Sequence, residues 1–197
     1  MINNIDKIKN LLKFESDDDF YFLQIIKRKK EHPELGSNSL IVKTYYIKSI
    51  EHLEKVFPEI VVLCNFHNAR AGINLNKRSF EKIAFQVLRK TTDIIMNKDY
   101  SSCKSAYDSV CGTYTNETEK KWIIDIDVKD LKLIEIVRND IKNCQPNKRE
   151  DKVIDVLETK NGYHIITKPF NLEEYMSFSE IEAVDIHKDN PTILYIP

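Results

Sequence analysis

Apolar side chains recur at helical spacing in several parts of the first hundred residues. This spacing predicts helices over residues 4–14, over residues 49–66 and from Ser79 onward. Pro58 removes a backbone donor, so the second of these helices is expected to be kinked or broken. Aromatic and β-branched residues predict strands over residues 20–26, 40–47 and 69–75. The first two of these strands are expected to form an antiparallel pair with a long connection.

The second half of the chain has a different rhythm. After a polar, less regular stretch over residues 97–121, the order becomes strand, helix, strand, strand, helix, strand. The first strand, over residues 121–128, leads into a helix over residues 130–143. The next two strands, over residues 153–159 and 163–167, meet at an Asn-Gly dipeptide. This dipeptide is typical of a type I′ hairpin turn, because both residues tolerate a positive φ.

Two aspartates, Asp125 and Asp127, lie in the strand over residues 121–128. Residues two apart in a strand point to the same side, so these carboxylates should share a face and lie about 7 Å apart. The apolar residues that alternate with them should pack behind: Trp122, Ile124, Ile126 and Val128. Paired carboxylates repel each other, and Mg²⁺ or Mn²⁺ removes that cost by coordinating both. The alternative is an ordinary amphipathic strand whose exposed face carries aspartates.

His164 follows the Asn-Gly turn, and Lys160 and Asn161 precede it. A turn flanked by an ammonium group, an amide and an imidazole is suited to holding a triphosphate. A surface hairpin with an incidental histidine is the alternative interpretation.

The overall charge does not indicate nucleic-acid binding, since 31 acidic and 30 basic residues leave a net charge of −1. A local cluster of Arg70, Lys77 and Arg78 could nevertheless contact template or primer phosphates. Solvated surface charge explains the same residues equally well.

The four scattered cysteines and the lack of an apolar leader argue against export and against a disulfide framework. We therefore expect a cytoplasmic protein, in a bacterial host cell if the chain is encoded by a phage. Its apolar runs are far shorter than the roughly 20 residues that span a bilayer, so no membrane role is expected.

Three segments together resemble the archaeo-eukaryotic primase superfamily, which includes primase-polymerases and small phage-encoded members. Ile123-Ile124-Asp125-Ile126-Asp127 is similar to a hydrophobic strand that ends in Asp-x-Asp. Lys160-Asn161-Gly162-Tyr163-His164-Ile165-Ile166 looks like the turn-and-strand motif with its histidine. Ala183-Val184-Asp185-Ile186-His187-Lys188 resembles the late motif, an aspartate among apolar residues.

The resemblance implies an α+β fold with a primase-type catalytic core of two αβ modules. Residues 1–197 would form one catalytic domain, with an N-terminal αβ module over residues 1–100. Residues 101–197 would form an RRM-like, mostly antiparallel sheet with flanking helices that carries the motifs.

The resemblance also implies a reaction, in which nucleoside triphosphates are joined on a single-stranded DNA template with release of pyrophosphate, in DNA replication or repair. A replicative helicase is a partner that such an enzyme would work with. Asp125, Asp127 and Asp185 would be the catalytic metal ligands for Mg²⁺ or Mn²⁺, and Asp189 is a second candidate for the third ligand. His164 would contact the phosphates of the nucleotide.

Two other functions remain open from the sequence. Glu158-Thr159-Lys160, together with the earlier aspartates, fits the Asp…Glu-x-Lys pattern of metal-dependent nucleases. The chain could also be a catalytically inactive module that binds nucleic acid and shares only the fold.

Overall fold

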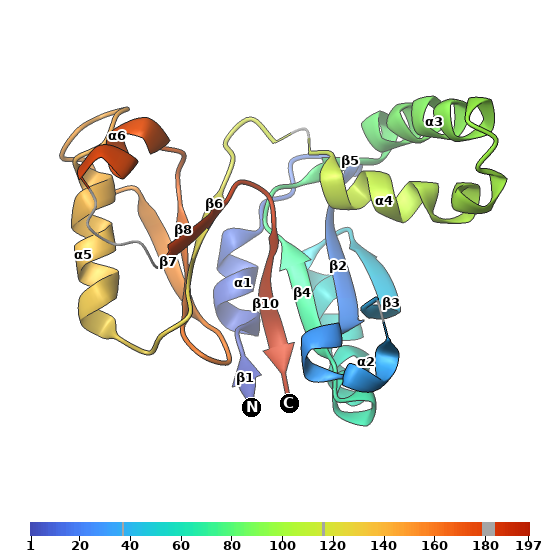
Figure 1. Ribbon diagram of the computed structural model, residues 1–197, viewed down its shortest axis with the longest axis horizontal. Coiled ribbons are helices and arrows are strands. Elements are labelled where there is room, and N and C mark those ends of the chain that lie inside the picture. Colours follow the sequence, from blue (N-terminus) through green and yellow to red (C-terminus); the bar gives the residue numbers. More distant parts are fainter. Residues whose placement is uncertain (37, 116, 179–183) are drawn as a thin grey trace.

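A computed structural model describes residues 1–197 except residues 37, 116 and 179–183. Two antiparallel sheets stand side by side, and helices pack on both (Figure 1). The expected α+β class is therefore confirmed.

The first sheet has the strand order β1-β10-β4-β2-β3, and β5 extends it by pairing with β2. Every pairing in this sheet is antiparallel. Its strands are β1 (Ile2–Asn3), β2 (Asp19–Lys27), β3 (Leu40–Ile47), β4 (Arg70–Asn74), β5 (Arg78–Ser79) and β10 (Pro191–Ile196). The predicted pair over residues 20–26 and 40–47 is confirmed as β2 and β3. Two short 3₁₀ turns, η1 (Lys29–Glu31) and η2 (Pro33–Leu35), lie in their connection.

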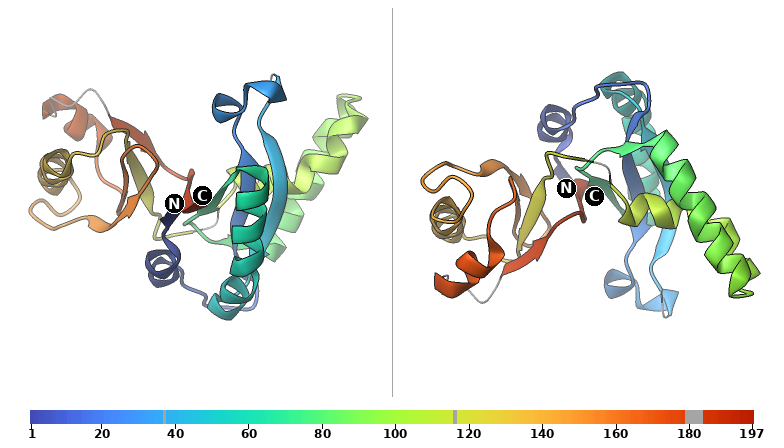
Figure 2. Two further views of the ribbon diagram at one scale, coloured as in Figure 1. Left: turned by 90° about the horizontal axis from the view of Figure 1, so that it is seen from below. Right: turned by 90° about the horizontal axis from the view of Figure 1, so that it is seen from above.

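The two faces of the first sheet are covered differently. Helices α1 (Ile5–Leu11) and α2 (Ile50–His67) pack against the face that carries Leu23 and Ile25. On the opposite face, Phe20 and Phe22 pack against α3 (Phe80–Met96) and α4 (Ala106–Thr113). Figures 1 and 2 show α3 and α4 at the end of the molecule that is remote from the second sheet. The part of this second face that α3 and α4 do not cover lines a cavity.

The helices differ from expectation in two places. Of the two expectations for Pro58, a kink or a break, the break is wrong, because α2 continues through this residue. Pro58 is exposed, and Leu53 and Ile60 anchor the helix in the core on either side of it. The stretch expected to be irregular contains a 3₁₀ helix, η3 (Tyr100–Ser105), followed by α4. Their N-cap residues, Asp99 and Ser105, are of the usual N-cap types, but neither makes a side-chain capping hydrogen bond. Among the described residues, no helix combines the length and apolar character needed to cross a bilayer.

The second sheet has the strand order β7-β8-β6-β9, again antiparallel throughout. Its elements follow the chain as β6 (Trp122–Ile126), α5 (Leu131–Lys142), β7 (Val153–Glu158), β8 (Tyr163–Thr167), α6 (Leu172–Phe178) and β9 (Val184–His187). Ile124 and Ile126 face the two helices and share a core with Ile134 and Val137 of α5. Val128, which was expected to pack there, is half exposed because β6 ends before it.

The expected division at residue 100 does not follow the sheets. The chain leaves the second sheet after β9 and returns to the first sheet as β10, which pairs with β4 and β1. Ile123, Leu157 and Ile166 of the second sheet belong to the same hydrophobic cluster as the core of the first. The two sheets therefore share one core, and the chain crosses between them twice.

The hairpin between β7 and β8 is confirmed, but its turn is of another kind. Residues 159–162 form the connection, where the Thr159 N–H donates to the Gly162 carbonyl and the Thr159 hydroxyl accepts from the Gly162 N–H. Neither Asn161 nor Gly162 has a positive φ, so the type I′ prediction is wrong. Glycine is required for another reason: a Cβ at Gly162 would overlap the Ile126 carbonyl oxygen and lie 2.7 Å from the Val128 nitrogen. The turn is thereby held against the end of β6.

Candidate active site between the two sheets

Three side chains form a row across the second sheet. Asp125 on β6 is paired directly with Asp185 on β9 and with His164 on β8. Paired residues of adjacent strands point to the same face, with Cβ atoms about 4.5–5.5 Å apart. Because Ile124 and Ile126 point to the helices, this row points the other way, toward the first sheet. Three segments widely separated in sequence therefore contribute neighbouring polar side chains.

His164 is held at both ring nitrogens. Its Nδ1 lies 2.8 Å from the hydroxyl of Thr192 on β10, and its Nε2 lies 3.4 Å from Asp125 Oδ1. Hydrogen bonding to His164 lowers the pKa of Asp125 despite partial burial, with smaller contributions from the charges of His187 and Arg28. Asp125 is therefore held in its charged form at neutral pH.

A cavity of about 800 Å³ opens in front of this row. Its opposite wall is the free part of the first sheet, where Ile26 and Ile193 alternate with core residues and so point into the cavity, and where Gly72 exposes its backbone to it. The basic residues Arg28 and Lys30, which follow β2, also line it. The cavity thus has an acidic wall on one sheet and basic side chains on the other.

Most residues predicted for the site line this one cavity: Asp125, Asp127, Asp185, His164, Lys160, Asn161 and Arg70. Asp127 is exposed and lies just beyond the end of β6. Ala183, which begins the third sequence motif, lies outside the described residues.

Asp189 takes a structural position. Its Oδ2 lies 2.7 Å from the Arg78 guanidinium, and its Oδ1 accepts from the side-chain amide of Asn76 at 3.0 Å. Asp189 does not line the cavity. Asp185 is therefore the aspartate that joins the row.

Lys77 and Arg78 do not fit the predicted nucleic-acid surface. Arg78 is fully buried, where it pairs with Asp189 and donates to the Cys111 carbonyl. Lys77 is also buried, in ion pairs with Glu15 and Asp19. Both charges are satisfied inside the protein, so Arg70 is the member of the predicted cluster that reaches the cavity.

The sequence reasoning missed Arg28, Lys30, His187 and Thr192. The basic run of residues 27–30 at the end of β2 was the signal available for the first two. Thr192 carried no signal, because its role depends on β10 crossing to the first sheet beside β8.

The donors suit a divalent cation that shares its ligands with a substrate. In the described part of the chain, no three His, Cys, Asp or Glu side chains converge into a formed metal site. Mg²⁺, however, is commonly bound through one or two carboxylates together with substrate phosphates and water. Asp125 and Asp185 as facing neighbours, with Asp127 at the same cavity, meet that requirement.

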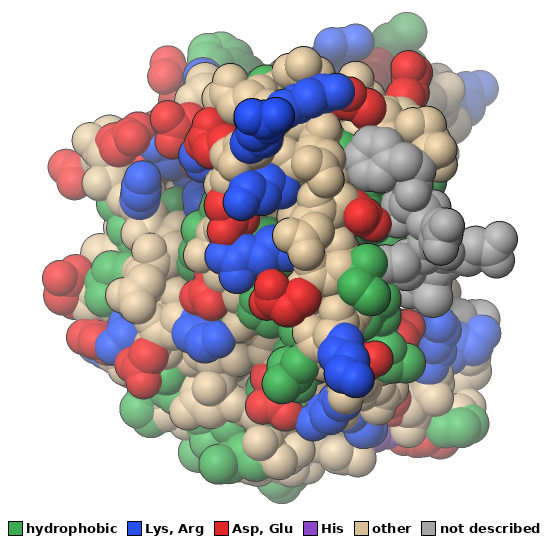
Figure 3. Space-filling view, turned by 90° about the vertical axis from the view of Figure 1, so that its left-hand side faces the viewer, with side chains coloured by type: hydrophobic (Ala, Val, Ile, Leu, Met, Phe, Trp, Pro, Cys, Tyr) green, Lys and Arg blue, Asp and Glu red, His purple; other side chains and the backbone are tan. Residues whose placement is uncertain are grey.

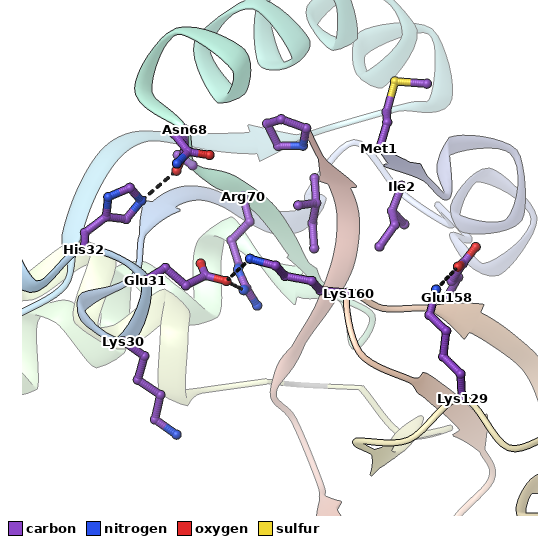
Figure 4. A pocket seen from close by; sticks show the side chains of 13 residues that line it. Met1, Ile2, Lys30, Glu31, His32, Asn68, Arg70, Lys129, Glu158 and Lys160 are labelled. Atoms are coloured by element: carbon purple, nitrogen blue, oxygen red, sulfur yellow. Dashed lines mark hydrogen bonds and ion pairs between the residues drawn. The ribbon is translucent and has the colours of Figure 1, made fainter.

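A second cavity of about 590 Å³ adjoins the first. Both cavities are lined by Lys30, Glu31, Arg70 and Lys160. Figure 4 shows Arg70 and Lys160 both directed at the carboxylate of Glu31, while Glu158 pairs with Lys129 at the other side of the second cavity. The outer surface around α5 and α6, in contrast, mixes acidic and basic side chains without a large area of one sign (Figure 3). The described residues on that side therefore form no strongly basic surface.

Comparisons with models of protein families, with curated proteins and with solved structures give no significant match for this chain.

Proposed function

We propose that this protein is a metal-dependent nucleotidyltransferase of the primase or primase-polymerase type. It would join nucleoside triphosphates on a single-stranded DNA template and release pyrophosphate. The observation that carries this proposal is the position of Asp125 between Asp185 and His164, in a cavity that Arg28, Lys30 and Arg70 line from the first sheet and the segment that follows β2. Acidic groups for a cation and basic groups for phosphates are the two requirements of phosphoryl transfer.

The topology of the second sheet supports the proposal. A β-α-β-β-α-β unit with the order β9-β6-β8-β7 corresponds to the ferredoxin-like arrangement that RRM domains also use. The first, second and third sequence motifs lie on the adjacent strands β6, β8 and β9 of that unit. This arrangement supports the proposal, because the resemblance to primases implies an RRM-like module that carries the motifs.

Each residue has a part in this proposal. Asp125 and Asp185, with Asp127, would hold Mg²⁺ or Mn²⁺, which when bound lowers the pKa of an attacking hydroxyl and offsets charge on the phosphates. Thr192 fixes the ring of His164 beside Asp125, where the imidazole can contact a phosphate that approaches the acidic row. Lys160 and Asn161, on the turn that Gly162 holds against β6, would contact the outer phosphates.

The nuclease alternative is less well supported. It requires Glu158 to act with Asp125 and Asp127 on one metal ion. Glu158 instead pairs with Lys129 and lines the second cavity, whereas the aspartates line the first. Of Glu158 and Lys160, only Lys160 lines the first cavity, where the aspartates lie.

The proposal is tested by primer synthesis. Purified protein is incubated with labelled nucleotides, a single-stranded template and Mg²⁺ or Mn²⁺, and products are resolved by length. We expect products from the wild type and a loss of at least about a hundredfold with Asp125→Asn or Asp185→Asn, the order of effect seen when electrostatic groups of an active site are removed. Asp17→Asn, which removes an exposed carboxylate away from the cavity, is the matched control.

Absence of products with either metal, or activity that Asp125→Asn leaves unchanged, would contradict the proposal. Degradation of the template without added triphosphate, insensitive to His164→Ala, would favour the nuclease. Template binding with neither metal nor nucleotide binding would favour the inactive module.

A further inference from the structure

Glu31 joins two cations that belong to different sheets. A single carboxylate oxygen, Oε1, contacts the Arg70 guanidinium at the start of β4 and lies 3.3 Å from Lys160 Nζ on the β7–β8 turn. Figure 4 shows the two basic side chains arriving from different elements and ending next to each other beside this carboxylate. Since all three residues line both cavities, the bridge lies where the cavities meet.

The two cations are not saturated by Glu31. Arg70 Nε is buried and, among the described residues, has no hydrogen-bond partner. The Lys160 side chain is 58% exposed and has two further hydrogens to donate. Partial burial acts to raise the pKa of Glu31, but Arg70 and Lys160 outweigh it and the pKa is lowered. Glu31 is thus an anion held by cations that can accommodate more negative charge.

Glu31 comes from a short connection rather than from a strand. It is the last residue of η1, and the following residue, His32, is anchored by Nε2 at 2.8 Å from the Asn68 carbonyl and by Nδ1 at 3.1 Å from Glu34. The backbone is therefore tied down beside Glu31, while the side chain itself is held only by its contacts with Arg70 and Lys160. Loss of the Glu31 contacts does not require any strand to move.

We propose that Arg70 and Lys160 form a subsite for the polyphosphate of a nucleotide, and that the Glu31 carboxylate occupies this subsite until the phosphates displace it. The ligand class is an inorganic or nucleoside polyphosphate, and its assignment to a nucleotide rests on the proposed function. Arg70 is thereby assigned to the nucleotide rather than to template or primer phosphates. Lys30, which lines both cavities, and Arg28 add positive charge nearby.

Displacement has an electrostatic basis. A polyphosphate carries several negative charges and many acceptor oxygens, so it can satisfy Arg70 and Lys160 together, including donors that one carboxylate oxygen leaves unused. Competition from Glu31 weakens binding, because its contacts with both cations must first be broken. Removing its charge while keeping its shape should therefore strengthen binding.

The test is isothermal titration calorimetry with tripolyphosphate in metal-free buffer of fixed ionic strength. We expect Glu31→Gln to bind about three- to tenfold more tightly than the wild type, the gain that follows from removing two partly exposed competing ion pairs. Lys160→Ala, a change at an exposed position, should weaken binding. Glu158→Gln removes a carboxylate that lines the second cavity but pairs with Lys129, so it is the matched control and should leave the affinity unchanged.

Equal or weaker binding to folded Glu31→Gln, or an equal gain in Glu158→Gln, would overturn the inference. Thermal unfolding of each variant establishes that it is folded. If Glu31→Gln does not fold, the Lys160→Ala variant tests the inference, and unchanged tripolyphosphate binding in that variant would overturn it. A single-stranded oligonucleotide without terminal phosphate is titrated in parallel. If Glu31→Gln strengthens the binding of the oligonucleotide but not that of tripolyphosphate, the subsite belongs to the template and the inference fails. These titrations need neither metal nor turnover. The inference about Glu31 can therefore hold when primer synthesis is not observed, and it can fail when primer synthesis is observed.

Discussion

Asp125 and Asp185 face each other directly across the paired strands β6 and β9, with their side chains on the same face of the sheet. Like charges opposite each other in adjacent strands are destabilising, and His164 lies on the far side of Asp125 from Asp185. The protein thus keeps an unfavourable pair at the edge of a cavity. Relief of that repulsion by a cation would link metal binding to stability.

The first prediction concerns this repulsion. Asp185→Asn should slightly stabilise the metal-free protein, by up to about 1 kcal/mol, because it removes one of two facing charges. The same variant should lose most of the increase in melting temperature that Mn²⁺ or Mg²⁺ produces in the wild type. Thermal unfolding with and without metal measures both effects, with Asp17→Asn as the control of equal charge change. A metal-dependent stabilisation that survives in Asp185→Asn would show that the cation binds elsewhere.

The second prediction separates Asp189 from Asp185. Asp189→Ala should cost about 3–5 kcal/mol of unfolding free energy, because it leaves the guanidinium of the fully buried Arg78 without its carboxylate. Urea unfolding measures the loss, and the exposed Asp185→Ala should show no comparable loss. A mild effect of Asp189→Ala would mean that Arg78 finds another partner or water.

The third prediction concerns acid stability. The folded-state pKa of Asp125 is lowered from the ordinary value of 3.8, mainly by the hydrogen bond with His164. The unfolded chain therefore binds this proton more readily than the folded protein. Its contribution to stability is fully present above the ordinary pKa and is lost as the pH falls through the lowered folded value.

Asp125→Asn removes that contribution. Below about pH 4 the stability of the wild type should fall more steeply with decreasing pH than that of Asp125→Asn, as measured by urea unfolding at a series of pH values. Asp17→Asn should keep the wild-type steepness. Parallel curves for the wild type and Asp125→Asn would contradict the pKa assignment.

The fourth prediction concerns the turn that carries Lys160 and Asn161. Gly162→Ala should destabilise the protein by about 3 kcal/mol or more, because the added methyl group meets the backbone of β6, which cannot yield as a flexible side chain would. Gly112→Ala, whose added methyl group would lie 3.9 Å from Phe22 within α4, is the matched control. That control should be neutral or stabilising by up to about 1 kcal/mol, since alanine favours a helix. Equal stability of the two variants would show that the turn is not held against β6.

Local pattern was sufficient for most of the elements. Ser79 and Asp130 start α3 and α5 as N-caps, each accepting a hydrogen bond from a backbone N–H of the first turn. The alternation around Ile124 and Ile126 correctly placed Asp125 on the face away from the helices. Pro58 does not break α2, because packing on both sides of it outweighs the loss of one backbone donor. The Asn-Gly turn was misjudged because approach to β6, and not φ, requires the glycine.

The sequence by itself determined which side chains alternate into the core and which polar residues remain on the other face, because that period is a property of each strand alone. It could not determine that Asp185 rather than Asp189 faces Asp125, since that depends on the register between β6 and β9. Nor could it show that Arg78 is buried whereas Arg70 reaches the cavity, or that Glu31 lies between Arg70 and Lys160. The Arg78–Asp189 and Glu31–Lys160 pairs exist only once the chain returns to the first sheet at β10 and the two sheets close on a common core, since each joins residues more than a hundred positions apart in the chain.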